Sequence, residues 1–290
     1  MNVLITGVTG LIGSALASEL QRRGDKVIGV SRRPSADQIS WEGMTPTLLD
    51  EVDAVVNLAG ESIAGRWTKS KKGRILDSRV EATSLVAAAI VNADNPPNCL
   101  VQASAAGFYG DRGSEVLDES AGPGEGFLAE VCQQWEAASQ PVMDMGIRTA
   151  VPRFSIVLAN GPGALGRLAL TTRLCVGGPL GNGRQWWSWV SLNDTVGSIM
   201  HLLDHDVSGA VNISTPNPET QRTFATTLGK VLRRPAFVSA PGFAISAALG
   251  EMGTSLLLDS FRLHPNVLLE NGFVFQDSEL EGALRRILCT

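Results

Sequence analysis

The chain has 290 residues, of which 44% are hydrophobic and 18% are charged, and its net charge is −5. This composition supports a sizeable core and excludes a disordered chain. The negative balance argues against nucleic acid or an anionic membrane as the main partner. The chain opens on an apolar run, residues 2–5, without a charged leader, so we expect no signal peptide or membrane span and a cytoplasmic location.

Cysteine and histidine spacing gives no sign of a metal site. The four cysteines lie too far apart in the sequence for a zinc knuckle or a redox pair. His201 and His205 have a helical i,i+4 spacing, but no HExxH motif accompanies them. We therefore expect a polar helix face there and no bound metal.

Short apolar runs alternate with helical patterns through the first half of the chain. Strand, helix and strand at this spacing predict an α/β fold, a Rossmann-type doubly wound parallel sheet with helices on both faces. The runs are so apolar that both sides of the sheet must be covered. The strands are expected at residues 3–6, 27–30, 54–58, 100–103 and 149–154, and the helices at 11–23, 69–91 and 127–140.

The composition changes after about residue 160, where glycine-rich loops at 161–163 and 177–183 suit a substrate-facing segment. We expect residues 1–160 to form the Rossmann domain, with about 190–215 returning to it through a strand near 210–214. Residues 161–290 are expected to form a smaller C-terminal substrate domain that ends in a helix at 279–288.

The strongest local signal is the run VLITGVTGLIG at residues 3–13. Gly7 permits a tight turn, Gly10 lets the backbone approach a pyrophosphate, and Gly13 lets helix and strand pack closely. The following helix offers free N–H groups to phosphates. The alternative is a tight turn without a ligand. The residues expected to contact a dinucleotide here are Gly7, Thr9, Gly10, Leu11, Ile12 and Gly13.

The second strand indicates the type of dinucleotide. An NAD site usually carries an acidic residue near this strand end, but here Arg32 and Arg33 follow. Two guanidinium groups suit a 2′-phosphate, so we predict NADP(H). The alternative is a pair of solvated surface arginines. After the third run, small residues in the segment Leu58, Ala59 and Gly60 let the chain pass close to the adenosine ribose.

Together these motifs resemble the extended short-chain dehydrogenase/reductase superfamily. The resemblance is closest to an atypical branch, the epimerase family, whose members are called nucleoside-diphosphate-sugar epimerase-like. The superfamily motifs match residues 6–13, 59–60 and 104–110, and those of the branch match residues 57–61, 66–67, 107–111, 127–130, 178–181, 183–185 and 272–275.

The superfamily's catalytic residues are displaced or absent. Its Tyr-x-x-x-Lys pair lets a tyrosine exchange a proton during hydride transfer. Tyr109 is the one tyrosine of this chain, its +4 residue is Gly113, and no lysine occurs between Lys72 and Lys230. The expected serine position holds Ala105, and Ser104 lies one residue early.

Other residues must therefore act if the protein is an enzyme. We rank Tyr109 first, because the resemblance places its loop beside the nicotinamide, and Glu130 second, because burial near a cleft would raise its pKa. Ser104 is a third candidate and is also expected to contact the cofactor. The alternatives are a phenol that bonds a loop backbone and a carboxylate on a helix surface.

The substrate pocket is expected to involve Glu61, Arg184 and Trp187. Three tryptophans within residues 186–189 suggest an apolar or stacking surface, and ordinary core packing is the alternative. Two functions follow. One is an NADP(H)-binding epimerase-like or oxidoreductase-like protein acting on a small molecule. The other is a non-catalytic NADP(H)-binding sensor or docking protein, which the branch links to division-related roles. The sequence names neither the substrate nor the oligomeric state.

Overall fold

A computed structural model describes residues 1–161 and 163–289, so Pro162 of the predicted glycine-rich loop lies outside the described residues. Its main sheet is parallel throughout and has the order β12-β8-β5-β4-β1-β2-β3, with β6 added beside β8. The predicted doubly wound parallel sheet is confirmed. The strands are β1 (Asn2–Thr6), β2 (Lys26–Val30), β3 (Gln38–Ile39), β4 (Ala54–Asn57), β5 (Cys99–Gln102), β6 (Ser104–Ala105), β8 (Arg148–Phe154) and β12 (Gly209–Ile213).

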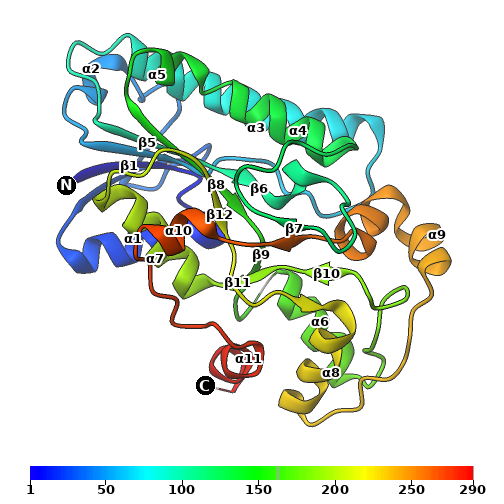
Figure 1. Ribbon diagram of the computed structural model, residues 1–290. Coiled ribbons are helices and arrows are strands. Elements are labelled where there is room, and N and C mark those ends of the chain that lie inside the picture. Colours follow the sequence, from blue (N-terminus) through cyan, green and yellow to red (C-terminus); the bar gives the residue numbers. More distant parts are fainter. Residues whose placement is uncertain (162, 290) are drawn as a thin grey trace.

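Two layers of helices cover the sheet (Figure 1). Helices α1 (Leu11–Arg23), α7 (Leu192–Asp204) and α10 (Asn266–Glu270) lie on one face. The other face carries α2 (Pro46–Leu49), α3 (Lys69–Val91), α4 (Phe127–Ala137) and α5 (Gln140–Asp144). Alternate residues of a strand point to opposite faces, so Val3 and Ile5 join the core under α1 while Leu4 joins the core under α3.

The helices follow the predicted periodicity closely. Those at residues 11–23 and 69–91 have the expected bounds. The stretch predicted as one helix at 127–140 is two helices, because α4 ends at Ala137 and Pro141 lies in the first turn of α5. Proline has no backbone N–H and cannot continue a helix through its interior.

A second lobe packs below the sheet. It contains α6 (Ala164–Arg173), α8 (Gln221–Leu232) and α11 (Leu280–Leu288) around a core that includes Trp187, Trp189 and Phe224. Its short strands pair as β9 with β11, β10 with β13, and β14 with β7. These strands are β7 (Val116–Leu117), β9 (Ile156–Leu158), β10 (Trp186–Trp187), β11 (Trp189–Ser191), β13 (Glu219–Thr220) and β14 (Arg262–Leu263).

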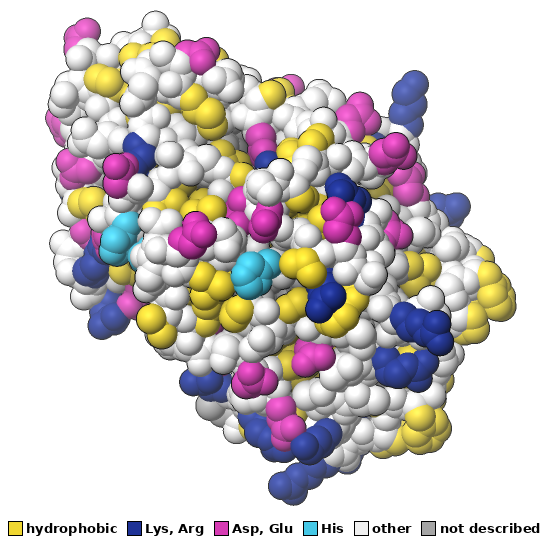
Figure 2. All heavy atoms as spheres, viewed as in Figure 1, with side chains coloured by type: hydrophobic (Ala, Val, Ile, Leu, Met, Phe, Trp, Pro, Cys, Tyr) yellow, Lys and Arg dark blue, Asp and Glu magenta, His cyan; other side chains and the backbone are white. Residues whose placement is uncertain are grey.

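Helix α9 (Gly242–Gly253) stands at the edge of this lobe and is kinked. Gly250 has φ 63° and ψ −150°, outside the helical region, and a π-helical turn, η2 (Thr254–Leu258), follows. On the face seen in Figure 2, hydrophobic side chains reach the surface at the edge where α9 lies. Phe243 of α9 is 80% exposed. Over residues 1–161 and 163–289, no helix is both long and apolar enough to cross a membrane.

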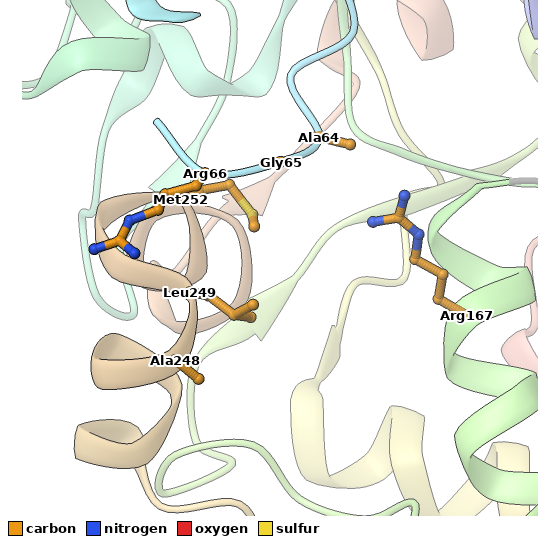
Figure 3. A pocket seen from close by; sticks show the side chains of 7 residues that line it. All are labelled: Ala64, Gly65, Arg66, Arg167, Ala248, Leu249 and Met252. Atoms are coloured by element: carbon orange, nitrogen blue, oxygen red, sulfur yellow. The ribbon is translucent and has the colours of Figure 1, made fainter. Parts of the chain in front are cut away.

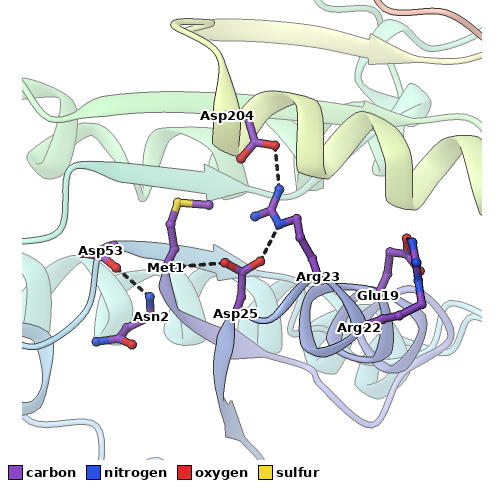
Figure 4. Close-up of polar contacts among 8 residues, drawn as sticks. All are labelled: Met1, Asn2, Glu19, Arg22, Arg23, Asp25, Asp53 and Asp204. Atoms are coloured by element: carbon purple, nitrogen blue, oxygen red, sulfur yellow. Dashed lines mark hydrogen bonds and ion pairs between the residues drawn. The ribbon is translucent and has the colours of Figure 1, made fainter.

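Polar contacts close the amino-terminal edge of the sheet (Figure 4). The ammonium group of Met1 lies 2.7 Å from Asp25, and Arg23 links the end of α1 to Asp204 of α7 at 2.6 Å. The backbone N–H of Asn2 donates to Asp53 at 2.6 Å. Ligands of open parallel sheets bind at the opposite edge, where the carboxyl ends of the strands meet.

Candidate functional site

The three glycines of the loop between β1 and α1 have different roles: two are required by close packing, and one leaves the front of the loop exposed. A Cβ on Gly7, whose φ is +66°, would lie 2.7 Å from the carbonyl oxygen of Leu58, and one on Gly13 would lie 2.3 Å from the carbonyl oxygen of Gly7. These two residues must be glycine for the loops to pack. Gly10 is exposed, and its Cβ would meet only the carbonyl oxygen of Gly7, at 3.1 Å. The front of the loop is therefore open to a ligand.

The first turn of α1 presents its N–H groups to that opening. Gly10 is the N-cap, no side chain caps the helix, and the first turn holds no acidic residue. Uncapped N–H groups and the positive end of the helix dipole favour a bound anion. Thr9 and Leu11 are exposed and Ile12 is half-buried, so the backbone of this turn is accessible.

A buried polar network holds the loops in place. Thr6 donates to the side-chain oxygen of Asn57, and the Asn57 amide donates to Gln102 at 2.8 Å and to Thr83 at 3.0 Å. The backbone N–H of Ala59 donates to the Thr6 hydroxyl at 3.3 Å. The carboxyl ends of β1, β4 and β5 are thus tied together. The sequence reasoning missed this network, although polar residues at the ends of three apolar strands were the signal for it.

The segment after β4 is fixed by cations on α3. Arg79 donates to the carbonyl oxygen of Glu61 at 3.0 Å, and its guanidinium packs closely on Gly60, where a Cβ would lie 3.1 Å from it. Burial lowers the pKa of Arg79. The Glu61 carboxylate pairs with Lys71 at 2.7 Å. That hydrogen bond lowers the pKa of Glu61, with a smaller contribution from Arg32.

Arg32 and Arg33 lie exposed just beyond β2. The backbone N–H of Arg33 donates to the Ser31 hydroxyl at 3.2 Å, which shapes the turn. Among the residues that the structure describes, neither guanidinium has an acidic partner within ion-pair distance. Both remain available to an anion that binds beside the glycine loop.

Tyr109 does not line a cleft. It is the last residue of η1 (Ala106–Tyr109) and is 0% exposed. Its hydroxyl donates to Asn212 of β12 at 2.8 Å and accepts from Arg153 at 3.0 Å. Burial raises the pKa of Tyr109. The phenol thus joins η1 to the strands β8 and β12, and its predicted position beside the cofactor stays a prediction.

Ser104 belongs to the same buried cluster. It is 1% exposed, and its hydroxyl donates to Glu136. Glu136 forms two bonds of 2.9 Å with Arg153, whose guanidinium lies 3.4 Å from the Phe108 ring centroid. Burial, the largest single effect, lowers the pKa of Arg153, but the hydrogen bonds and charges of Glu136 and Tyr109 together outweigh it and the pKa is raised. The structure thus turns the Ser104 hydroxyl inward, away from a ligand, and adds Glu136 and Arg153, which the sequence reasoning missed.

The remaining predicted residues are dispersed. Glu130 lies exposed on the first turn of α4, so the burial that the prediction required is missing. Trp187 is 3% exposed and its ring centroid lies 5.4 Å from that of Phe224, so it packs in the core, which is the alternative that the sequence left open. Arg184 is exposed on the loop before β10, where its backbone N–H donates to Asn182 at 2.7 Å.

A hollow of about 360 Å³ lies between the segment after β4, helix α6 and helix α9 (Figure 3). The predicted pocket residues Glu61, Arg184 and Trp187 are not among those that line it. A second hollow, of about 400 Å³, shares Arg167 with the first. The first hollow is lined by Ala64, Gly65, Arg66, Arg167, Ala248, Leu249 and Met252.

The parallel sheet, the glycine loop and the uncapped helix define a Rossmann-type protein of the dinucleotide-binding class. Residues 3–214 match the family model described as the NAD dependent epimerase/dehydratase family. Residues 240–287 match a domain of unknown function (DUF1731). The chain belongs to the NAD dependent epimerase/dehydratase family.

Relatives of similar length support this assignment. Epimerase family protein SDR39U1 of Homo sapiens is 36% identical over 99% of this chain and 100% of the relative. Epimerase family protein YfhF of Bacillus subtilis (strain 168) is 37% identical over 99% of this chain and 98% of the relative. The crystal structure of human SDR39U1 (isoform2) with NADPH superimposes with a TM-score of 0.93, at 35% identity over 99% of both chains. The predicted resemblance to the epimerase family is confirmed.

Proposed function

We propose that this chain binds NADPH across the carboxyl ends of β1, β2 and β4, and uses it as an epimerase-like or oxidoreductase-like enzyme on a small molecule. The observation that carries the proposal is that two exposed groups follow the neighbouring strands β1 and β2: Gly10 at the uncapped start of α1, and the pair Arg32 and Arg33, which form no ion pair among the described residues. The NADPH bound to human SDR39U1, at 35% identity, supports the choice of cofactor.

Each part of the cofactor has a matching element. The pyrophosphate belongs over Gly10, where the N–H groups of Leu11 and Ile12 begin the helix. The 2′-phosphate belongs between Arg32 and Arg33, whose charged hydrogen bonds contribute roughly 1.5–3 kcal/mol each. The adenosine ribose belongs along residues 58–60, which the Thr6–Asn57 network holds against the glycine loop.

The bound nicotinamide would supply hydride transfer, and the protein would supply position and a proton. Tyr109 and Ser104 are enclosed, so Glu130 is the one of the three candidates that a bound molecule can reach, although its exposed carboxylate lacks the burial that the prediction required. It lies on the first turn of α4, which packs on η1 where Leu128 approaches Gly107. We assign this role to Glu130 as part of the proposal.

Calorimetry with NADPH and NADH tests the cofactor assignment. We expect wild-type protein to bind NADPH at least tenfold more tightly than NADH, and Arg32→Gln/Arg33→Gln to lose that preference. Arg22→Gln, an exposed arginine of α1 paired with Glu19, is the matched control and should change neither affinity. Equal affinity of the wild type for both cofactors would overturn the assignment.

A substrate screen by NADPH absorbance tests the reaction. Without a Tyr-x-x-x-Lys pair we expect no brisk turnover of UDP-sugars or simple ketones, since a missing general acid costs about 10²–10⁴-fold in rate. For any substrate that is turned over, Glu130→Gln should lower kcat by a similar factor while NADPH affinity stays unchanged. Full activity of Glu130→Gln would remove this residue from the mechanism.

A further inference from the structure

The hollow between α6 and α9 has one side chain whose charge points into it. Arg167 extends from α6 toward Ala64 and Gly65, whereas the guanidinium of Arg66 points away from the space (Figure 3). Arg167 is exposed and, within the described part of the chain, has no acidic partner at ion-pair distance. None of the lining residues is acidic. An unpaired guanidinium in a concave site favours a carboxylate or a phosphate.

The opposite wall of the hollow is apolar. Helix α9 contributes Ala248, Leu249 and Met252, and Leu249 is 37% exposed. Met252 is 9% exposed and packs in one cluster with Trp67, so this part of the wall is anchored to the protein. A volume of about 360 Å³ falls within the range of roughly 300–1,000 Å³ that small-molecule pockets occupy.

The hollow is connected to the proposed cofactor site by one segment of the chain, residues 58–66. The start of this segment, Leu58, lies against Gly7 of the glycine loop, and its later part, Ala64 to Arg66, lines the hollow. The Trp67 indole donates to the carbonyl oxygen of Ile63 at 2.8 Å, which closes the turn whose residues Ala64 to Arg66 line the hollow. One short segment of the chain thus supplies both a wall of the proposed cofactor site and a wall of the hollow.

We propose that this hollow is the substrate subsite, and that it takes a small amphipathic anion. The carboxylate or phosphate head binds Arg167, and the apolar body lies against Leu249 and Met252. The inference rests on the proposed function, in which NADPH occupies the neighbouring loops. It differs from the sequence-based expectation, which gave the anion to Arg184 and the apolar surface to Trp187.

Titration of the NADPH-saturated full chain with hexanoate, hexyl phosphate and 1-hexanol, followed by ligand-observed NMR, tests this inference. We expect at least one of the two anions to bind at least tenfold more tightly than 1-hexanol. The tighter of hexanoate and hexyl phosphate identifies the head group. Inorganic phosphate alone should bind more weakly than hexyl phosphate, because it lacks the apolar part. Equal binding of 1-hexanol, or no binding of either anion at millimolar concentration, would overturn the inference.

Two variants locate the binding. Arg167→Gln should weaken the anion at least tenfold and leave NADPH affinity unchanged, and Leu249→Asn should weaken hexyl phosphate more than inorganic phosphate. Arg173→Gln is the matched control on the same helix, because it lines the second hollow and not the first. Unchanged anion binding in Arg167→Gln, or an equal loss in Arg173→Gln, would contradict the assignment. If wild-type protein fails to bind NADPH, the proposed function fails, and the same titrations without NADPH still report on the hollow.

Discussion

Two parts of the same sheet edge differ in what their polar groups do. At the ends of β1 and β2, the N–H groups of α1 are uncapped and Arg32 and Arg33 carry no ion pair among the described residues. At the ends of β6 and β8, Ser104 and Arg153 are bonded within a buried cluster. Binding a ligand needs polar groups that the fold leaves unpaired, whereas paired and buried groups serve stability. The first part therefore has the unpaired groups that the proposed cofactor site requires, and the second, the buried cluster of Ser104, Glu136 and Arg153, is a structural joint.

The largest expected effect is on stability, and it tests whether the buried Glu136–Arg153 pair of the joint is structural. Glu136→Gln should lower the free energy of unfolding by about 3–5 kcal/mol, because the Arg153 cation would stay buried without its partner. Urea denaturation measures the loss. Adding Arg153→Met should restore part of it, since no uncompensated charge then remains. If the single variant stays fully stable but loses NADPH, the joint belongs to the site and the contrast fails.

Gly10→Val addresses the open part. The side chain would occupy the pyrophosphate position, so NADPH affinity should fall at least about 100-fold, or about 2.7 kcal/mol, while the protein stays folded. The fold should persist because a Cβ at this position meets only the carbonyl oxygen of Gly7 at 3.1 Å. Gly122→Val, at a loop glycine with open space around it, is the control. Calorimetry that finds NADPH still bound to folded Gly10→Val would refute the site.

Tyr109→Phe is expected to cost stability and not cofactor binding. Loss of the hydroxyl leaves Asn212 and Arg153 short of a partner, which should lower the free energy of unfolding by about 1–3 kcal/mol. Thermal unfolding and NADPH calorimetry on the same sample separate the two readouts. If Tyr109→Phe kept its stability but lost activity, Tyr109 would again be a candidate general acid.

The smallest effect concerns the pH dependence of stability at Asp259, which is coupled to Asp111. Burial, with a contribution from Asp111, raises the pKa of Asp259 from 3.8 to about 6. The folded state thus holds this proton more tightly, so ionised Asp259 destabilises the fold above pH 6, and the penalty disappears as the pH falls towards 3.8. Asp259→Asn should add about 1–2 kcal/mol at pH 7.5, after allowance for partial exposure, and almost nothing at pH 4. Equal gains at both pH values would contradict this origin.

The cofactor half was predictable because its signals are local. The strand, the three glycines and the helix at residues 11–23 lie within one short run, and each backbone requirement restricts the residue type. Helical periodicity over residues 69–91 is long enough to identify that helix with its bounds.

The joint was not predictable because its partners are distant in the sequence. Tyr109 meets Asn212, and Ser104 meets Glu136, only after β8 and β12 have joined the sheet. No periodicity distinguishes a phenol that faces a ligand from one that is buried against a strand. The hollow is equally non-local, because Arg167 and Met252 come from different helices of the second lobe.

The kink of α9 determines the shape of the hollow that this helix lines. Gly250 separates Leu249 from Met252, and its φ of 63° is a conformation that residues with a Cβ rarely adopt. Two dihedral angles at one residue therefore set the angle between the halves of the wall. A change there reshapes the space without altering any lining side chain, so divergence in the size of accepted molecules can arise from backbone geometry alone.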